Sequence, residues 1–410
     1  MVMSQYGDLR DNPLPYAIWG EEFIDPEARQ QMDNAMRLPV SIAGALMPDA
    51  HVGYGLPIGG VLAVEDAVIP YAVGVDIACR MRLSLYRESP ILINQKIGQF
   101  RKALMEQTRF GAGKKWARHE RVSHPVLDDP DWDSTRFLRS LHQTAVEQLG
   151  TSGSGNHFVE WGAFRLEADQ PDLGLEHGEY LALLSHSGSR GVGYQIASTY
   201  SKQAMLLHQE LDKTIRHLAW LSLETHIGQE YWIAMNLAGR FAAANHEVIH
   251  QRVAKAIGLK PILSLENHHN FAWKERFPAP PGYQQGEREV IVHRKGATPA
   301  GKGVLGIIPG SMGDPGYLVR GRGLIESLNS ASHGAGRAMS RRQAAETITK
   351  TERDRYLQAR GVTLLGGGLD EAPQAYKPIE QVMAAQRELV DLLGQFRPML
   401  VRMTHEAGND

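Results

Sequence analysis

The only cysteine of the chain, Cys79, ends the run Gly74-Val75-Asp76-Ile77-Ala78-Cys79. A carboxylate and a thiolate three residues apart offer a divalent cation one hard and one soft ligand. Four further segments place histidine beside glycine or asparagine: Gly155-Asn156-His157, Ser185-His186-Ser187-Gly188, His268-His269-Asn270 and Ser332-His333-Gly334. Histidines in such backbone-permissive settings are rarely core residues, so we expect ligands and nucleophiles placed on turns.

A second pair of residues that could take part in catalysis or metal binding lies in Met47-Pro48-Asp49-Ala50-His51-Val52-Gly53. Asp49 and His51 are two apart after a predicted strand, so their side chains share a face if the strand continues. The pair fits a carboxylate that orients a catalytic or metal-bound imidazole. A turn aspartate beside a structural histidine fits the spacing as well.

Several glycine-rich segments suit phosphate. In Gly153-Ser154-Gly155-Asn156-His157 the backbone N–H groups can approach an anion closely. His186-Ser187-Gly188-Ser189-Arg190 adds two hydroxyls and a guanidinium. The polar segments His293–Thr298 and Pro309–Gly313, between predicted strands, resemble a nucleotide-binding loop. For the first two segments, a short flexible loop without a ligand is the alternative.

The segment from Ser332 to Arg341 is the best candidate for covalent chemistry. Arg337 and Arg341 are four apart, so on a helix they would share a face beside His333. A histidine at a helix start, with two guanidiniums behind it, is well placed to attack a phosphorus whose charge they neutralise.

A competing motif is His246-Glu247-Val248-Ile249-His250, which has the His-Glu-x-x-His pattern of zinc metalloproteases in a predicted helix. Glu266 could be a third ligand. The short pattern arises readily by chance among 17 histidines, and it leaves Cys79 without a role. We retain the protease only as a minor alternative.

Composition limits the classes of function. With 410 residues, 42% hydrophobic and 22% charged, the chain has the composition of a globular enzyme. One cysteine fits a reducing compartment, Met1 to Asn12 lacks an apolar signal segment, and no apolar run is long enough for a membrane span. These features predict a cytoplasmic protein.

A net charge of −2 argues against coating nucleic acid by bulk electrostatics. Between Gly316 and Arg360, however, basic residues outnumber the acids Glu326, Glu346, Glu352 and Asp354. They are Arg320, Arg322, Arg337, Arg341, Arg342, Lys350, Arg353, Arg355 and Arg360. This segment fits either a local basic face or an ordinary solvated helix surface.

The elements that must position these residues mix strands and helices. Strands are predicted at Ile42–Met47, Gly59–Val64, Met81–Tyr86, Tyr180–Leu184, Val290–His293 and Gly303–Ile308. Helices are predicted at 90–110, 134–149 and within 193–257, with an exposed connection at 111–135. Pro378 opens a last helix, with Ile379, Val382, Met383, Gln386, Val390 and Leu393 on one face. Without a regular βαβ rhythm, we expect a mixed α/β (α+β) fold.

Taken in order, the motifs resemble those of the RtcB family of RNA-splicing ligases, over roughly residues 40 to 400. The matching segments are Pro48-Asp49-Ala50-His51, Val75-Asp76-Ile77-Ala78-Cys79, Gly155-Asn156-His157-Phe158, His186-Ser187-Gly188-Ser189-Arg190, His269-Asn270, His293-Arg294-Lys295-Gly296-Ala297-Thr298, Pro309-Gly310-Ser311-Met312-Gly313 and Ser332-His333-Gly334-Ala335-Gly336-Arg337. The resemblance implies a single catalytic domain over residues 1–410, with mixed β-sheets flanked by helices around a central metal cleft.

The resemblance also implies an activity and its residues. The family uses GTP and Mn(II) to join RNA ending in a 3′-phosphate or 2′,3′-cyclic phosphate to RNA with a 5′-hydroxyl. His333 would take GMP from GTP, and Asp49 would orient it. Two Mn(II) ions, with Zn(II) as a substitute, would be held by Asp76, Cys79, His157, His186 and His269, and Cys79 would be shared between them. GTP contacts are implied for Asn156, Glu160, Ser311, Ala335, Gly336, Tyr376 and Arg402. RNA or phosphate contacts are implied for Arg190, Lys295, Arg337 and Arg341.

Departures from the family pattern keep other hypotheses open. Ser152 and Ser154 replace leucine and glycine, Arg80 follows Cys79 where glycine is usual, and Gly316 replaces a guanine-contacting serine. Arg402 stands near the position of the lysine in the family's Val-Lys-Gly tail. A divergent paralogue for RNA repair is therefore an alternative to a tRNA-splicing enzyme. Two further hypotheses are a metal-dependent phosphatase or cyclic phosphodiesterase without ligation, and an RNA-end-binding partner of a repair or ribosome-rescue system.

Overall fold

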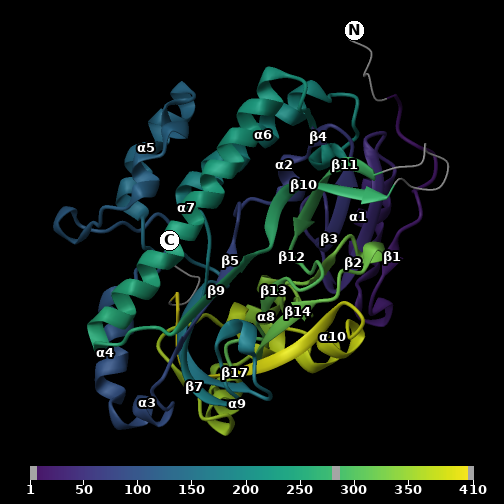
Figure 1. Cartoon of the computed structure of the whole chain (residues 1–410). Coiled ribbons are helices and arrows are strands. Elements are labelled where there is room, and N and C mark those ends of the chain that lie inside the picture. Colours follow the sequence, from purple (N-terminus) through teal and green to yellow (C-terminus); the bar gives the residue numbers. More distant parts are fainter. Residues whose placement is uncertain (1–6, 279–286, 405–410) are drawn as a thin grey trace.

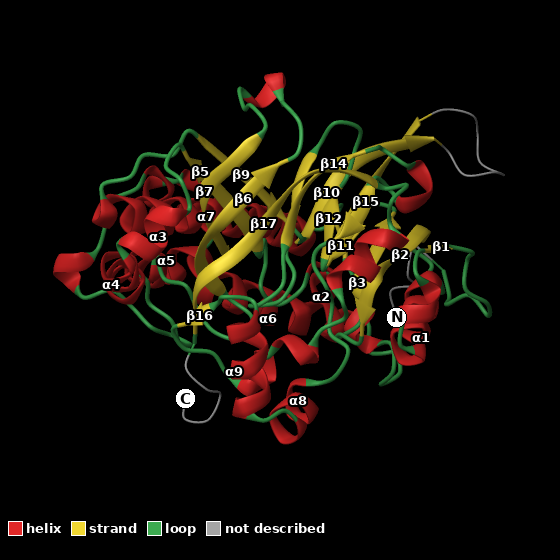
Figure 2. Cartoon of the chain, turned by 90° about the horizontal axis from the view of Figure 1, so that it is seen from below, coloured by secondary structure: helices red, strands yellow, loops and turns green. Residues whose placement is uncertain are grey.

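The computed structural model describes residues 7–278 and 287–404 and has the mixed α/β fold that the sequence predicts. Two β-sheets form its centre, and helices surround them (Figures 1 and 2). Within the described residues, none of the helices has the length and apolar character that crossing a membrane requires.

The smaller sheet carries Asp49. Its strand order is β1-β2-β3-β11-β10. The bounds are β1 Ala17–Ile18, β2 Ser41–His51, β3 Ile58–Val64, β11 Glu287–Lys295 and β10 Asn270–Pro278. Strand β2 continues to His51, so Asp49 lies in extended backbone near the end of a central strand.

The larger sheet has the order β13-β14-β17-β6-β7-β5-β9, with β16 also paired to β17. The bounds are β13 Leu305–Ile308, β14 Gly316–Gly321, β17 Val390–Met403, β6 Phe158–Leu166, β7 Gly178–Ser187, β5 Arg80–Tyr86, β9 Leu263–His268 and β16 Thr363–Leu364. Two short ribbons complete the strands, pairing β12 Ala297–Pro299 with β15 Ser330–Ser332 and β4 Ala67–Val68 with β8 Leu221–Ser222.

Helices cover the sheets. They are α1 Pro26–Met36, α2 Pro70–Val73, α3 Ile91–Gln95, α4 Ile97–Gln107, α5 Arg136–Gln148, α6 Arg190–Leu207, α7 His226–Ile257, α8 Arg341–Thr347, α9 Lys350–Ala359 and α10 Ile379–Ala385. The long α7 runs along one side of the molecule (Figure 1) and packs on α4, α6, β5 and β7. Segment 111–135 contains short 3₁₀ helices, with Trp116, Val126 and Trp132 buried among exposed polar residues.

Strand β7 is buried on both faces, and its alternating side chains contact different neighbours on each face. Leu181 and Leu183 belong to the core cluster that contains residues of α4 and α7, whereas Ala182 and Leu184 pack in the cluster on the other face. By the same alternation, Ser185 faces α7 and His186 faces the opposite side.

Two predictions of local structure are wrong. The last helix ends at Ala385, so Val390 and Leu393 lie in β17, which pairs with β14 and β6 at the centre of the large sheet. Inter-strand hydrogen bonds there override the helical spacing. The second error concerns His333, which does not start a helix, because α8 begins only at Arg341.

Gly336 explains why the chain between His333 and Arg341 stays irregular. Its φ of +71° is a left-handed conformation, and a Cβ there would lie 2.1 Å from the carbonyl oxygen of Asp49. The segment thus passes directly over the end of β2 instead of coiling.

Candidate active site

Four neighbouring strands deliver the predicted metal ligands to one edge of the large sheet. His157 directly precedes β6, His186 is the penultimate residue of β7, Cys79 directly precedes β5 and His269 directly follows β9. Strands β6, β7, β5 and β9 are adjacent in the sheet and antiparallel. The first residues of β6 and β5 therefore lie beside the last residues of β7 and β9, at the same end of these strands. His186 lies within a strand, so the expectation that these histidines are all on turns is wrong for it.

The turn that carries Asp76 and Cys79 is fixed by backbone contacts. The Cys79 N–H donates to the Asp76 carbonyl at 3.1 Å, and the Ala78 N–H donates to the Asn270 carbonyl at 2.7 Å. The His269 N–H donates in turn to the Cys79 carbonyl at 3.0 Å. Residues far apart in the sequence are therefore held together by main chain as well as by side chains.

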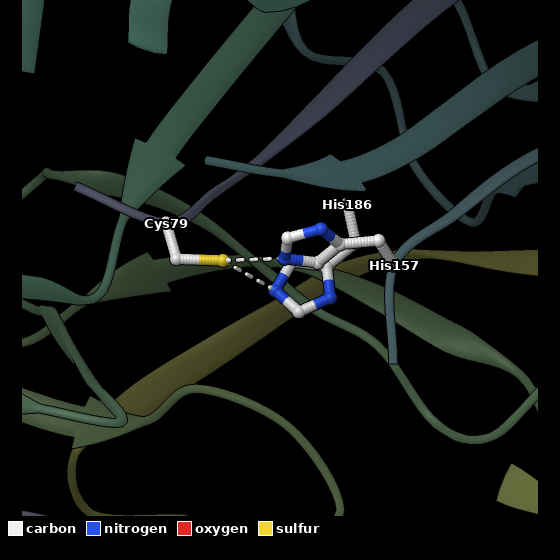
Figure 3. Close-up of side chains that lie close together, drawn as sticks. All are labelled: Cys79, His157 and His186. Atoms are coloured by element: carbon white, nitrogen blue, oxygen red, sulfur yellow. Dashed lines mark hydrogen bonds between the residues drawn. The ribbon is translucent and has the colours of Figure 1, made fainter. Parts of the chain in front are cut away.

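The side chains converge on the sulfur (Figure 3). Sγ of Cys79 lies 3.4 Å from Nε2 of His157 and 3.1 Å from Nε2 of His186. Asp76 Oδ2 is 2.9 Å from Nε2 of His157, and Nε2 of His269 is 3.2 Å from Nε2 of His186. Cys79, His157 and His186 are all buried.

The tautomers show that this cluster fits a cation. Nδ1 of His186 lies 3.1 Å from the Asn156 carbonyl oxygen, and Nδ1 of His157 lies 3.1 Å from that of Ser152. A carbonyl only accepts, so Nδ1 of His186 carries a proton and its Nε2 lone pair points at the sulfur. Nδ1 of His157 lies 3.1 Å from Nη1 of Arg190 as well, and its Nε2 faces the carboxylate of Asp76. Histidine metal ligands commonly donate the far N–H to a carbonyl, as His186 does here.

Ionisation in the cluster follows from burial and from the neighbours. Burial and the nearby His157 lower the pKa of His186 to about 3, so its imidazole is neutral. Burial alone would raise the pKa of Asp76, but the hydrogen bond and charge of His157 lower it to about 2. Burial and Asp76 raise the pKa of the Cys79 thiol well above its usual value, so a thiolate there requires a compensating cation.

His333 stands beside this cluster, at the end of β15. Its ring centroid is 4.9 Å from that of His269. Asp49 is fully buried, and its Oδ2 accepts from Nδ1 of His333 at 2.7 Å and from the His333 N–H at 3.1 Å. The proton therefore sits on Nδ1, which leaves Nε2 with a free lone pair. The Asp49 carboxylate orients His333 rather than His51, whose Nδ1 lies 3.0 Å from the Asp49 carbonyl oxygen and 3.5 Å from the Arg337 N–H.

A cleft of about 1330 Å³ contains both features. Most predicted site residues line it: Asp76, Cys79, Asn156, His157, His186, His269, Lys295, Ser311, His333, Ala335, Gly336, Arg337, Arg341 and Tyr376. Lys295 is buried, donates to the Leu56 carbonyl at 3.0 Å, and has its pKa lowered to about 7 by burial.

Four predicted site residues do not line the cleft: Asp49, Glu160, Arg190 and Arg402. Asp49 lies behind His333, and Arg190 lies beside the ring of His157 with its Nη1 3.4 Å from Ser187 Oγ. Glu160 is buried in β6, and burial raises its pKa well above the usual value. Arg402 donates to the carbonyls of Leu104 and Thr108 at the end of α4.

The guanidiniums of Arg337 and Arg341 meet through an acidic residue, not through a shared helix face. Both pair with Glu371, Arg337 at 3.2 Å, and Arg341 also pairs with Asp370 at 2.9 Å. Tyr376 donates its hydroxyl to the same Glu371. Glu371 is 3% exposed, so one buried carboxylate organises this wall of the cleft.

The expected basic face of segment 316–360 is largely neutralised by acids outside it. Arg320 pairs with Asp172, Arg322 with Asp391 and Arg360 with Asp314. Asp370 and Glu371, which pair with Arg337 and Arg341, also lie outside residues 316–360. These pairs weaken the hypothesis of an RNA-end-binding partner that relies on this segment.

The segments expected to bind phosphate serve partly as internal supports. Ser187 Oγ donates to the Ser152 carbonyl at 3.0 Å, and Ser189 Oγ donates to the Ile77 carbonyl at 2.6 Å. His293 and Arg294 lie within strand β11, so the expectation of a loop there is wrong, and only the end of that strand reaches the cleft.

Arg80 points away from the cleft. It is buried against α7, donates to the Gly239 carbonyl at 2.9 Å and pairs with Glu266 at 2.9 Å. Glu266 is thereby engaged and is no third ligand for the His-Glu-x-x-His motif.

That motif forms a separate, hydrogen-bonded pair on α7. Ser185 Oγ lies 2.8 Å from Nδ1 of His246 and 2.9 Å from Nε2 of His250. Ser84 Oγ lies 2.8 Å from Nδ1 of His250. Glu247 is 43% exposed on its side chain and faces His124 instead, so the three motif residues do not converge on one point.

The structure adds supporting residues that the sequence did not reveal. Lys377 donates to the carbonyls of Pro48 and Ala50, at 3.1 and 2.8 Å, and so fixes the backbone on both sides of Asp49. Gln386 Oε1 accepts from the Ser332 N–H at 2.9 Å, directly before His333. Glu371 and Gln386 carry no local signal, since their role comes from pairing with distant residues.

Comparison with known proteins places these motifs in a family. The model described as "tRNA-splicing ligase RtcB" matches residues 31–133 and 131–404. The RNA-splicing ligase RtcB of Escherichia coli K12 is 32% identical over 96% of this chain and 98% of its own length. The tRNA-splicing ligase RtcB of Nanoarchaeum equitans is 32% identical over 90% of each chain. The RNA-splicing ligase RtcB of Mycobacterium bovis is 31% identical over 87% of this chain and 96% of its own length.

Proposed function

The chain belongs to the RtcB family, and we propose that it is an RNA ligase whose reaction centres on His333. One observation carries the proposal: a buried carboxylate fixes Nδ1 of His333, which leaves Nε2 free in a cleft beside a thiol and imidazole cluster. A histidine so oriented is a competent nucleophile toward phosphorus. The predicted 3′-phosphate or 2′,3′-cyclic phosphate ends and 5′-hydroxyl ends of RNA are the substrates we propose.

Asp76, Cys79, His157, His186 and His269 would hold two Mn(II) ions. Asp76 pairs with His157, whereas His186 pairs with His269, and the sulfur of Cys79 contacts both groups. This division supports one site on each side of the sulfur, and the same donors also suit Zn(II). When bound, the ions would stabilise the thiolate and neutralise phosphate oxygens.

The reaction we propose proceeds through a histidine–GMP intermediate. Water first opens a cyclic phosphate to a 3′-phosphate. Nε2 of His333 then bonds to the α-phosphorus of GTP, and pyrophosphate leaves. The hydrogen bond to Asp49 keeps the proton on Nδ1 of His333 and stabilises the positively charged ring. An oxygen of the RNA 3′-phosphate next displaces His333 from that phosphorus. Finally the 5′-hydroxyl attacks the activated RNA phosphorus, and GMP departs.

Cationic side chains around the cleft support a phosphate substrate. Arg337 and Arg341 would exchange part of their pairing with Glu371 for phosphate oxygens. The pKa of Lys295, near 7, would rise beside a phosphate, so binding would favour its charged form. Asn156, Ser311, Ala335, Gly336 and Tyr376 line the same cleft and are the GTP contacts we propose, with Glu160 behind them in β6.

The direct test is covalent labelling. Incubation of the full chain with Mn(II) and GTP labelled on the α-phosphate should leave acid-labile label on the protein. His333→Ala should abolish the label and still bind metal, because no metal-cluster contact depends on its Nε2. Equal labelling of His333→Ala and the unmodified protein would refute the assignment.

Asp49→Asn tests the orienting role separately. The amide can present its NH₂ to Nδ1, which selects the wrong tautomer and puts the proton on Nε2. An aspartate that orients a catalytic histidine elsewhere contributes roughly 10⁴-fold, so we expect a loss of at least about 100-fold in labelling rate. The pre-steady-state rate of label incorporation measures this effect, and an unchanged rate would contradict it.

A second candidate is a metal-dependent cyclic phosphodiesterase or phosphatase without ligation. The position of Arg402, committed to the carbonyls of α4 rather than to the cleft, favours it. This enzyme would open 2′,3′-cyclic phosphate ends without GTP. Joining that depends strictly on GTP would exclude it.

The cellular context follows from the chemistry we propose. A buried cysteine that must stay reduced to bind metal fits the cytoplasm. RNA repair, with or without a partner protein from a repair or ribosome-rescue system, and tRNA splicing are the two settings in which such RNA ends arise.

A further inference from the structure

An exposed aromatic cluster stands at the mouth of the cleft. Tyr54, in the loop between β2 and β3, has a ring centroid 6.3 Å from that of Tyr71 in α2 and 5.9 Å from that of His217 in the 3₁₀ helix Arg216–Leu218. Tyr71 and His217 are themselves 4.9 Å apart. Tyr54 is 67% exposed and lines the cleft, so one aromatic ring faces solvent with two rings behind it.

The backbone beneath this ring is held on several sides. Lys295 donates its Nζ to the carbonyls of Tyr54 and Leu56. Gln31 bonds both the N–H and the carbonyl of Gly53, at 3.0 and 2.6 Å. Gly55 has φ +73°, and a Cβ there would lie 2.8 Å from the His217 carbonyl oxygen. An exposed aromatic on a fixed backbone loses little conformational entropy when it binds a partner.

The cluster adjoins the reacting groups. Lys295, which supports Tyr54, directly precedes Gly296, where a Cβ would lie 3.1 Å from Cε1 of His333. Tyr71 lies five residues before Asp76, in the helix that leads into the metal-ligand turn. Burial and the neighbouring charges of Arg216 and Lys295 lower the pKa of His217, so at neutral pH this ring is an uncharged aromatic next to the guanidinium of Arg216.

We infer that Tyr54, backed by Tyr71 and His217, is a stacking platform for a nucleobase at or next to the reacting end of a single-stranded RNA. The inference rests on the proposed ligase function and adds where its RNA lies. Bases of single-stranded RNA stack on exposed aromatic rings, and nearby cations attract the backbone. An arrangement of aromatic rings and a cation at the cleft mouth offers both contacts. The base can belong to the 3′-phosphate strand or to the 5′-hydroxyl strand.

The test measures binding of single-stranded oligoribonucleotides to the full chain with Mn(II), by fluorescence anisotropy. Tyr54→Ala should weaken binding about 10-fold, within the range that base stacking contributes. Tyr54→Phe keeps the ring face and should bind within about two-fold of the unmodified protein. Tyr194→Ala is the matched control, since Tyr194 is 59% exposed but does not line the cleft. It should bind normally.

Abasic nucleotides identify the strand. One oligonucleotide lacks the base next to the 3′-phosphate, and the other lacks the base that carries the 5′-hydroxyl. One of the two should weaken binding to the unmodified protein and cause no further loss with Tyr54→Ala, which shows that ring and base interact. Normal binding by Tyr54→Ala, equal losses in the Ala and Phe variants, or fully additive losses for both oligonucleotides would overturn the inference.

Labelling with GTP separates this inference from the function on which it rests. Tyr54→Ala should form the covalent GMP adduct at the rate of the unmodified protein, because Tyr54 contacts neither His333 nor the metal ligands among the described contacts. Failure of the unmodified protein to be labelled would refute the ligase mechanism, whereas the anisotropy series would still decide the platform.

Discussion

Strand β7 separates two groups of buried histidines. On one face, His186 joins His157, His269 and Cys79; on the other, Ser185 bonds to His246 and His250 of α7. Burial lowers the pKa of His186, His246 and His250 alike, so burial and pKa do not distinguish the groups.

The partners of the ring nitrogens do distinguish them. A serine hydroxyl both donates and accepts, and Ser84 and Ser185 satisfy both nitrogens of His250. In the other group, Nε2 of His157 and Nε2 of His186 face the sulfur, and their Nδ1 atoms lie against carbonyl oxygens. The serine bonds complete the hydrogen bonding of His250 and hold α7 to the sheet, although Nε2 of His246 has no hydrogen-bond partner among the described residues. The second arrangement would be completed by the cation that we propose.

Removal of the shared sulfur should produce the largest effect. Cys79→Ala deletes the atom that contacts both His157 and His186, so metal binding, GMP labelling and RNA joining should all fall to background although His333 is intact. Metal content by mass spectrometry and label incorporation measure this. A folded Cys79→Ala protein that keeps its metal and its label would show that the sulfur is not the bridge.

Removal of a histidine from the other group should affect stability and spare the chemistry. His250→Ala leaves the hydroxyls of Ser84 and Ser185 short of partners and opens a cavity, which should lower the free energy of unfolding by roughly 2 kcal/mol. Urea denaturation at pH 8 measures the loss. Metal content should match that of the unmodified protein, and its loss would place His250 in the metal site.

The same variant should change the response to acid. Burial holds the pKa of His250 well below 6.5 in the folded protein. Below pH 6.5 the unfolded chain therefore binds a proton that the folded chain does not, and stability falls as pH falls, by about 1.4 kcal/mol per pH unit for each such group. His250→Ala removes one group, so its decline should be shallower by that amount; parallel curves would contradict the assignment.

Replacement of the motif's carboxylate should have the smallest effect. The side chain of Glu247 is 43% exposed and contacts the imidazole of His124 at 3.5 Å and the amide of Gln251 at 2.7 Å. Glu247→Gln should therefore change stability by less than about 0.5 kcal/mol and leave labelling unchanged. A metalloprotease would need this glutamate as its general base. Loss of activity in Glu247→Gln would therefore revive the protease hypothesis.

Local patterns predicted much of the fold. The strands around Ile42–Met47, Gly59–Val64 and Met81–Tyr86 and the long helices within 193–257 are confirmed, because alternation and helical periodicity there agree with the tertiary contacts. The last helix was overextended because Val390 and Leu393 keep a helical spacing inside a strand that the sheet stabilises. The mixed α/β class was correct, and the single-domain boundary at 1–410 stays a prediction.

The sequence predicted the residues of the candidate site better than it predicted the contacts between them. Ordered motifs identified the cysteine, the histidines and Asp49, and the structure brings the cysteine and the candidate histidines to one cleft, with Asp49 behind His333. Glu371, Lys377 and Gln386 were missed because each acts through a partner far along the chain. For the same reason the sequence left open whether the basic segment forms a basic face or an ordinary solvated surface, since its counterions lie outside it.

The sequence by itself determined which chemistry is available. The type of a side chain and the presence of a glycine beside it are local properties of the sequence. A thiol, a carboxylate and several histidines next to glycine or asparagine therefore already indicated metal and phosphorus chemistry. Only the tertiary structure decided which histidines gather around Cys79 and which are bonded to serines. That choice depends on the face of β7 from which each residue projects and on the order of β6, β7, β5 and β9, which long-range hydrogen bonds set.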